Sequence, residues 1–134
     1  MEVASKIHKV ITEMNYSPRG INNGKCGEFA DRLLKKLGGK TNDVYVLTTD
    51  DFNYTNLGHK KHYTKFGGLP IGMSFAEVKL IDHAWVYCHG KHYDAQTPHG
   101  VDGYLNLTWF IENLPDIIED LNLQKYKEKY RGHH

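Results

Sequence analysis

The chain has 134 residues, of which 40% are hydrophobic and 25% charged, as in an ordinary globular domain. Seventeen Lys and Arg against sixteen Asp and Glu leave a formal net charge of +1, which argues against a nucleic-acid or anionic-membrane partner. No apolar stretch reaches the roughly 20 residues of a membrane span, and the N-terminus lacks the layout of a secretion signal. We expect a single cytoplasmic domain over residues 1–134, with residues 132–134 resembling the start of a purification tag.

Two helices are expected in the first third of the chain. Apolar residues at helical spacing predict a helix over residues 3–14, and residues 15–24, rich in Gly and Asn, predict a loop. A second, amphipathic helix is predicted over residues 26–37, where two glycines end it. Its expected buried face consists of Phe29, Ala30, Leu33, Leu34 and Leu37.

Strand-like runs make up the middle of the chain, at residues 44–49, 75–81, 83–88 and 91–95. The polar stretch 50–74 is long for a connection inside a compact domain and is a candidate flap over a cleft. Two short helices are expected in the last third, the second one opened by Pro115. Helices, a meander of strands and helices again are typical of the α+β class.

Cys26 stands at the predicted N-terminus of the second helix, where unpaired backbone N–H groups and the helix dipole stabilise a thiolate. The same N–H groups can hold the oxyanion of a tetrahedral intermediate, with Asn22 or Asn23 as a second donor. A small buried hydrophobic residue is the alternative reading of a lone cysteine. The apolar face of this helix is complete without Cys26, however, which favours a nucleophile.

A tight hairpin is expected after the strand over residues 83–88. The pair His89-Gly90 has the chemistry of a two-residue turn, which folds the following strand back on the preceding one. This turn places residues 92–95 opposite residues 84–87, approximately. Residues on this hairpin therefore lie side by side although they are about ten positions apart.

His83 and Asp94 occupy facing ends of that predicted hairpin. We expect the carboxylate of Asp94 to orient the ring of His83 and to stabilise its protonated form, as the third member of a catalytic triad does. With Cys26 as nucleophile and His83 as general base and acid, the three residues form a candidate Cys-His-Asp triad. Gln96, on the same face as Asp94, is a second-choice orienting group.

The second cysteine, Cys88, lies on the opposite face of its strand from His83, roughly 16 Å further along at about 3.3 Å per residue. It is therefore expected to be too far from Cys26 to form a disulfide. The chain has no CxxC or HExxH pattern, so we expect no metal and no cofactor. A zinc ion shared by His89 and His92 through the turn remains an alternative.

The segments GKCGEFADRLLKKLGG and HAWVYCHGKHYDAQTPHG resemble the transglutaminase-like, papain-like superfamily of cysteine enzymes. The resemblance covers residues 20–50 and 75–105, about half of the chain. It implies a papain-like core in which the nucleophile begins a helix packed on an antiparallel β-meander, with helices at the C-terminus. It also implies the roles given above to Cys26, His83 and Asp94. Nothing in the chain matches the extra domains or calcium sites of the large cross-linking members.

These observations predict a thiol-dependent hydrolase or acyltransferase that acts on an amide, isopeptide or ester bond through a thioester. A cysteine peptidase or amidase (a thiol protease) and a transglutaminase-like acyltransferase both fit, with a protein or peptide as substrate. A catalytically inactive binding or inhibitory module on the same fold is the alternative, suggested by the tyrosine-bearing stretch DDFNYTNLGHKKHYTKF. The oligomeric state is left open.

Overall fold

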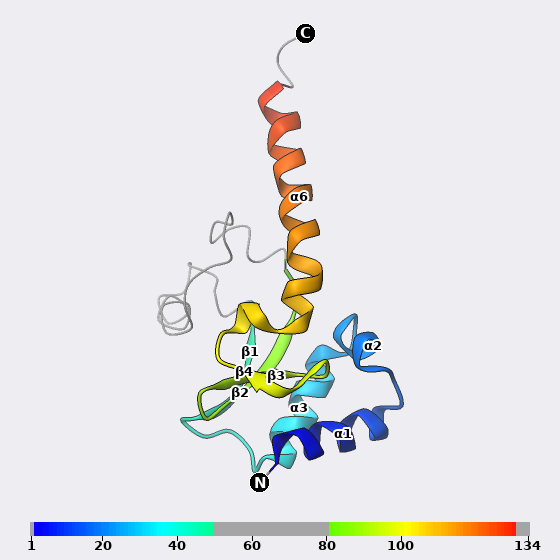
Figure 1. Ribbon diagram of the computed structural model, residues 1–134, viewed down its shortest axis with the longest axis vertical. Coiled ribbons are helices and arrows are strands. Elements are labelled where there is room, and N and C mark those ends of the chain that lie inside the picture. The colour runs from blue at the N-terminus through cyan, green and yellow to red at the C-terminus, as the bar shows by residue number, and fades with distance from the viewer. Residues whose placement is uncertain (1, 50–80, 131–134) are drawn as a thin grey trace.

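The computed structural model describes residues 2–49 and 81–130, which form an α+β arrangement (Figure 1). In chain order its elements are the helices α1 (Val3–Met14), α2 (Pro18–Asn22) and α3 (Cys26–Lys36), the strands β1 (Val44–Thr48), β2 (Ala84–Cys88), β3 (Lys91–Asp94) and β4 (Thr97–Val101), the 3₁₀ helix η2 (Tyr104–Asn106) and the helix α6 (Thr108–Tyr130). The predicted α+β class is confirmed. The assignment of residues 1–134 to one domain stays a prediction.

The four strands form one antiparallel sheet in the order β1-β2-β3-β4, so each strand pairs with its neighbours along the described chain. Between β2 and β3, Val86 lies opposite Tyr93 and Tyr87 opposite His92, which confirms the predicted register of the hairpin. His89 and Gly90 both have positive φ angles, 48° and 89°, as the two central residues of a type I′ turn require. The turn therefore fixes which residues of the two strands face each other.

The two faces of the sheet have different partners. Ala84, Val86 and Cys88 point to the face covered by α1 and α3, where they pack with buried residues of both helices. Trp85 points to the opposite face and packs with η2 and the start of α6. Figure 1 shows the sheet between these two sets of helices. The alternation predicted along this strand is confirmed, and it determines on which side of the sheet each functional side chain lies.

The first helices agree with the sequence except between residues 15 and 24. The helices predicted at residues 3–14 and 26–37 are confirmed as α1 and α3, and the N–H of Gly39 bonds back to the carbonyl of Leu34 at the end of α3. The predicted loop is wrong over α2. Ser17 caps this short helix by accepting a 3.0 Å hydrogen bond from the N–H of Gly20, and Pro18 is its first residue.

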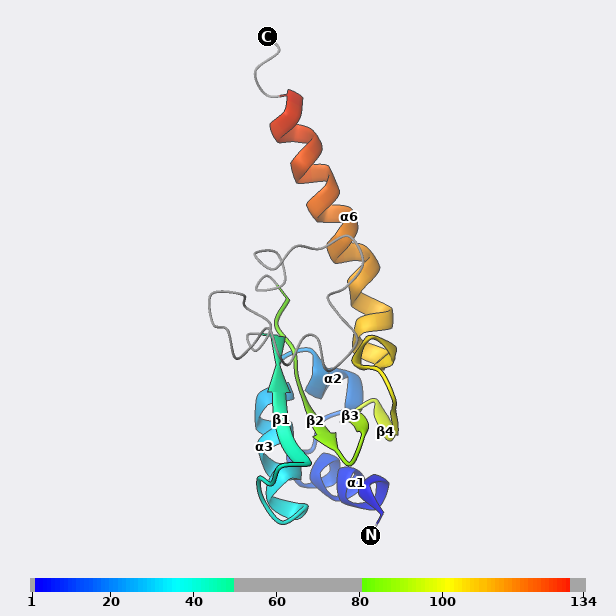
Figure 2. The same cartoon turned by 90° about the vertical axis from the view of Figure 1, so that its left-hand side faces the viewer.

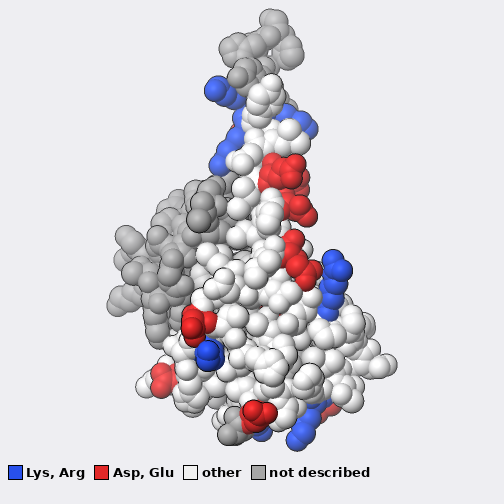
Figure 3. Space-filling view, viewed as in Figure 1, with Lys and Arg blue, Asp and Glu red and all other residues white. Residues whose placement is uncertain are grey.

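The C-terminal part forms one helix, where the sequence predicted two. Pro115 lies inside α6 and opens no new helix. Proline removes the hydrogen bond to the carbonyl of Ile111, but Ile111 is 61% exposed, so water can replace the lost donor. Figures 1 and 2 show the second half of α6 extending away from the other described elements. On the face seen in Figure 3, acidic side chains lie along the middle of α6 and basic ones near its end.

Residues 50–80, between β1 and β2, lie outside the described part of the chain, which therefore excludes the candidate flap 50–74 and all of the predicted strand 75–81 except Ile81. Ile81 itself belongs to no strand. The strand β4 was not predicted, because its Pro98 and Gly100 are unfavourable in strands. It lies at the edge of the sheet, where a missing donor costs little.

The helix that carries Cys26 packs on an antiparallel meander, as expected. The specific papain-like core is not what the structure shows. Four consecutive strands in one sheet and a single long C-terminal helix fit the general α+β class, because the last third of the chain extends as one helix instead of folding back in several. No helix among the described residues is long and apolar enough to cross a membrane.

Candidate functional site

Cys26 is the first residue of α3, and no side chain caps this helix end. The half-buried thiol interacts with the side chain of His83 and with the backbone N–H of Ala84. Burial by itself raises the pKa of the thiol, but these two interactions outweigh it and hold the pKa of Cys26 below its ordinary value. Asp82 opposes them with its negative charge. The environment of Cys26 therefore favours a thiolate.

His83 is held in place by backbone and side chain together. Its carbonyl accepts a 3.1 Å hydrogen bond from the N–H of Thr49, whose hydroxyl donates to the carbonyl of Ile81 at 2.6 Å. Its ring is buried, and its Nε2 lies 3.1 Å from Oδ2 of the equally buried Asp94. The other ring nitrogen, Nδ1, has no hydrogen-bond partner among the described residues. It is thus the nitrogen left for the thiol of Cys26.

The surroundings of His83 favour its protonated form. Burial lowers the pKa of the imidazole, but the hydrogen bond to Asp94 and the interaction with Cys26 outweigh it, so that the pKa of His83 is raised. The ring also stacks on Trp109, with centroids 4.6 Å apart and planes inclined by 5°. An indole face attracts a cation, which adds to the same preference. A lowered thiol pKa beside a raised imidazole pKa is the pattern of a thiolate–imidazolium pair.

Gln96 connects Asp94 to Asn22, the last residue of α2. Its backbone N–H donates to Oδ1 of Asp94 at 3.0 Å, and its side-chain oxygen accepts from Nδ2 of Asn22 at 2.9 Å. Its side-chain nitrogen donates to Glu112 at 3.2 Å. Because a carboxylate only accepts hydrogen bonds, Glu112 fixes the orientation of the Gln96 amide and, through it, that of Asn22. Gln96, the second-choice orienting residue, therefore holds Asp94 through the backbone N–H of Gln96 and not through its side chain.

The structure brings all the predicted site residues together. Asp94 is hydrogen-bonded to His83, whose ring interacts electrostatically with the thiol of Cys26, and Asn22 lies beside them with its side-chain nitrogen bonded to Gln96. Asn23 is exposed at the rim of the same site. The catalytic and oxyanion roles of these residues stay predictions.

Cys88 is free, like Cys26, and it points to the face of the sheet covered by α1 and α3, away from Trp85. Burial raises the pKa of its thiol. The two cysteines form no disulfide with each other.

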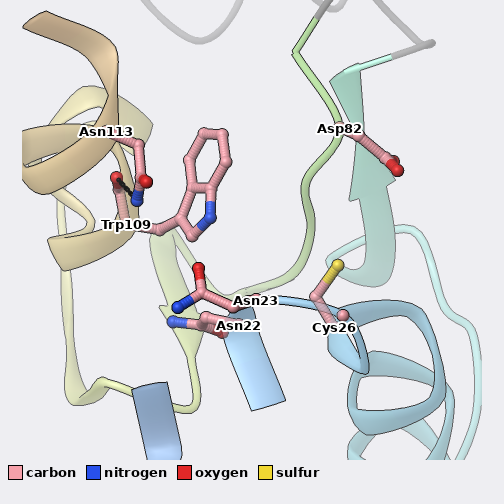
Figure 4. A pocket seen from close by; sticks show the side chains of 7 residues that line it. Asn22, Asn23, Cys26, Asp82, Trp109 and Asn113 are labelled. Carbon is pink, nitrogen blue, oxygen red and sulfur yellow. Dashed lines mark hydrogen bonds between the residues drawn. The ribbon is translucent and has the colours of Figure 1, made fainter. Parts of the chain in front are cut away.

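A cleft of about 240 Å³ opens over the thiol, and its lining consists of Asn22, Asn23, Gly24, Cys26, Asp82, Trp109 and Asn113 (Figure 4). In Figure 4 the sulfur of Cys26 and the side chain of Asp82 lie on one side of the cleft, and Trp109 and Asn113 on the other. No role was predicted for Trp109, Asp82 or Asn113 from the sequence. Asp82 could have been suspected as the neighbour of His83, but nothing in the sequence connects α6 with the thiol.

Metal binding finds no support among the residues that the structure describes, since they contain no group of three or more His, Cys, Asp or Glu side chains suited to an ion. His92, one of the two ligands considered in the sequence, is buried instead. Its Nδ1 accepts a 2.9 Å hydrogen bond from Nε1 of Trp85. Burial lowers the pKa of His92 to about 4, with a small opposing effect of Asp102. The His92 side chain is therefore neutral at physiological pH, and it acts as a hydrogen-bond acceptor inside the core.

Comparison of the chain with models of protein families, with curated proteins and with solved structures gives no match. The function is therefore inferred from the geometry of the site.

Proposed function

We propose that the protein is a thiol-dependent hydrolase or acyltransferase that attacks an amide, isopeptide or ester carbonyl through Cys26, His83 and Asp94. One observation carries this proposal: a thiol at a helix N-terminus faces a buried imidazole whose other nitrogen is bonded to a buried carboxylate. Burial alone would raise the pKa of the thiol and lower that of the imidazole, whereas here both shifts run the other way.

The chemistry follows from these positions. The thiolate of Cys26 adds to the carbonyl carbon of a substrate in the cleft, and the negative oxygen is stabilised by backbone N–H groups at the start of α3. The imidazolium of His83 then donates its proton to the leaving amine or alcohol, and a thioester remains. Water or an amine attacks the thioester, giving its proton to His83, and the thiolate leaves. Asp94 keeps the ring oriented in both half-reactions.

The order of the motifs supports the same chemistry. A cysteine before an amphipathic helix, followed by a histidine and an aspartate on consecutive strands, is similar to the order in transglutaminase-like cysteine enzymes. We take this likeness as support for the reaction class, with a protein or peptide as the expected substrate. The alternative, an inactive binding module, drew on residues 50–66, which fall outside the described part of the chain.

Labelling with a neutral thiol electrophile tests the proposal without knowledge of the substrate. At pH 7, iodoacetamide is expected to alkylate Cys26 faster than a free thiol and much faster than Cys88, as read by mass spectrometry of the two peptides. His83→Ala is expected to remove this advantage. Equal alkylation rates at the two cysteines in the native protein would refute the proposal that Cys26 is an activated nucleophile. An alkylation rate at Cys26 that is unchanged in His83→Ala would refute it too.

Turnover is the second test. A library of peptide amides and esters is screened with the native protein, with Cys26→Ala and with Cys88→Ala as the matched control. Hydrolysis or transfer is expected to vanish in Cys26→Ala and to persist in Cys88→Ala, with an acyl adduct on Cys26 visible by mass. Activity that survives Cys26→Ala would show that the thiol is not the nucleophile.

A further inference from the structure

The charged groups around the thiol do not balance. When Cys26 and His83 form an ion pair their charges cancel, and the buried carboxylate of Asp94 then leaves the catalytic group with an excess negative charge. Asp82 adds a second one at the wall of the cleft. The N-terminus of α3 offsets only about half of one charge.

Among the residues that the structure describes, the nearby cations lie outside the cleft. No Lys or Arg of the described residues lines the cleft. Lys25, the neighbour of Cys26, has its ammonium 5.7 Å from the ring centroid of Tyr16, and Arg19 is paired with Glu112 at 3.6 Å. The described side chains therefore leave the cleft electronegative.

Asp82 acts on the reacting atom itself. It immediately precedes His83, its side chain is exposed, and its carboxylate stands on the same side of the cleft as the sulfur of Cys26 (Figure 4). The carboxylate is close enough to oppose ionisation of the thiol. The same carboxylate would attract a positively charged group on a substrate bound at the thiol.

The wall across the cleft suits a cation as well. Trp109 lines the cleft opposite Asp82, beside the amide side chain of Asn113 (Figure 4). The face of Trp109 is stacked on His83, whereas the amide oxygen of Asn113 can accept hydrogen bonds from ammonium or guanidinium groups. The two walls thus offer a carboxylate and an amide to the same ligand.

From this arrangement we infer that the cleft selects an acyl donor with a positive charge next to the carbonyl that Cys26 attacks, such as a lysine or arginine side chain or a free amino group, and discriminates against acidic ones. This inference rests on the proposed function. Since Asp82 is exposed and its field is screened by salt, we expect it to account for about a five- to tenfold preference at low ionic strength.

Charged thiol reagents test the field at Cys26 without a substrate. The probes are methanethiosulfonates bearing a trimethylammonium, a neutral or a sulfonate group, each rate being divided by the rate with a free small thiol. For Cys26 the cationic probe is expected to be favoured over the anionic one. Asp82→Asn is expected to reduce that preference about five- to tenfold, and Asp82→Glu to keep most of it. Asp31→Asn, which removes an exposed carboxylate further along α3, is the matched control and should change nothing.

The outcomes separate this inference from the proposed function. Faster reaction of the anionic probe than of the cationic one, or a probe preference that is unchanged in Asp82→Asn, would overturn the inference. Either result would do so even if the neutral probe reacts at Cys26 as fast as with an activated thiol. Slow reaction of the neutral probe at Cys26 would instead overturn the proposed function. With substrates, peptide amides that differ only by Lys, Gln or Glu beside the scissile bond should rank in that order in kcat/KM, and a ranking led by Glu would refute the selection.

Discussion

Acid should destabilise this protein through His92, a buried histidine outside the candidate triad. The folded state keeps His92 neutral because burial lowers its pKa to about 4, whereas an exposed histidine has a pKa of 6.5. Protonation would also remove the acceptor for the 2.9 Å hydrogen bond from Trp85. The side chain thus connects the stability of the core to pH, and its ring partner Trp85 lies against His83, with centroids 5.9 Å apart.

The sign and size of the effect follow from the two pKa values of His92. Between pH 6.5 and about 4 the unfolded chain binds a proton at this histidine and the folded chain does not, so the stability falls as the pH falls. A difference of about 2.5 pH units, at 1.36 kcal/mol each, corresponds to a loss of about 3 kcal/mol from the free energy of unfolding. This is a large part of the 5–15 kcal/mol that a typical domain possesses.

Urea unfolding, followed by tryptophan fluorescence at several pH values between 7 and 4, measures this loss. His92→Asn keeps an acceptor for Trp85 but cannot titrate, and the exposed His99→Asn is the matched control. Comparing slopes with pH removes the contribution of the carboxylates, which titrate in all three proteins. We expect the stability of His92→Asn to fall by about 3 kcal/mol less than that of the native protein and of the control. Equal slopes in all three would refute the assignment.

Three further predictions concern the site and its hairpin. Activity should rise with pH as Cys26 ionises below its ordinary pKa and fall where His83, with its raised pKa, loses its proton, so a rate that only rises with pH would exclude the ion pair. Asp94→Asn should preserve folding by circular dichroism but lower kcat by at least about a hundredfold. Gly100→Ala should destabilise the protein by about 1–3 kcal/mol in urea unfolding, because φ is +76° and the added Cβ would lie 2.7 Å from the ring of Tyr93.

The residues of the triad could be predicted because their geometry is set locally. The start of α3 follows from its apolar spacing and the glycines after it, which places Cys26 at a helix N-terminus. The register of the β2–β3 hairpin follows from its two-residue turn, which places Asp94 within reach of His83. Both features depend on short-range steric and hydrogen-bonding preferences that a single sequence reveals.

What the sequence did not predict depends on tertiary contacts. Proline is normally a helix boundary, but Pro115 lies inside α6, and Ile111, whose carbonyl loses its helical donor, is exposed to water. The stacking of Trp109 on His83 requires α6 to dock beside β2, and no local pattern encodes that contact. The two sides of the cleft consequently come from segments about eighty residues apart, Cys26 on α3 and Trp109 on α6.

The two cysteines of the chain provide an internal comparison of what surroundings do to one functional group. Both are free, and burial opposes ionisation of both. At Cys88 nothing outweighs that burial, and the pKa rises; at Cys26 an imidazole and a backbone N–H outweigh it, and the pKa falls. A reagent or pH effect that appears at Cys26 and not at Cys88 therefore reports on His83, Asp94 and the end of α3, rather than on thiol chemistry in general.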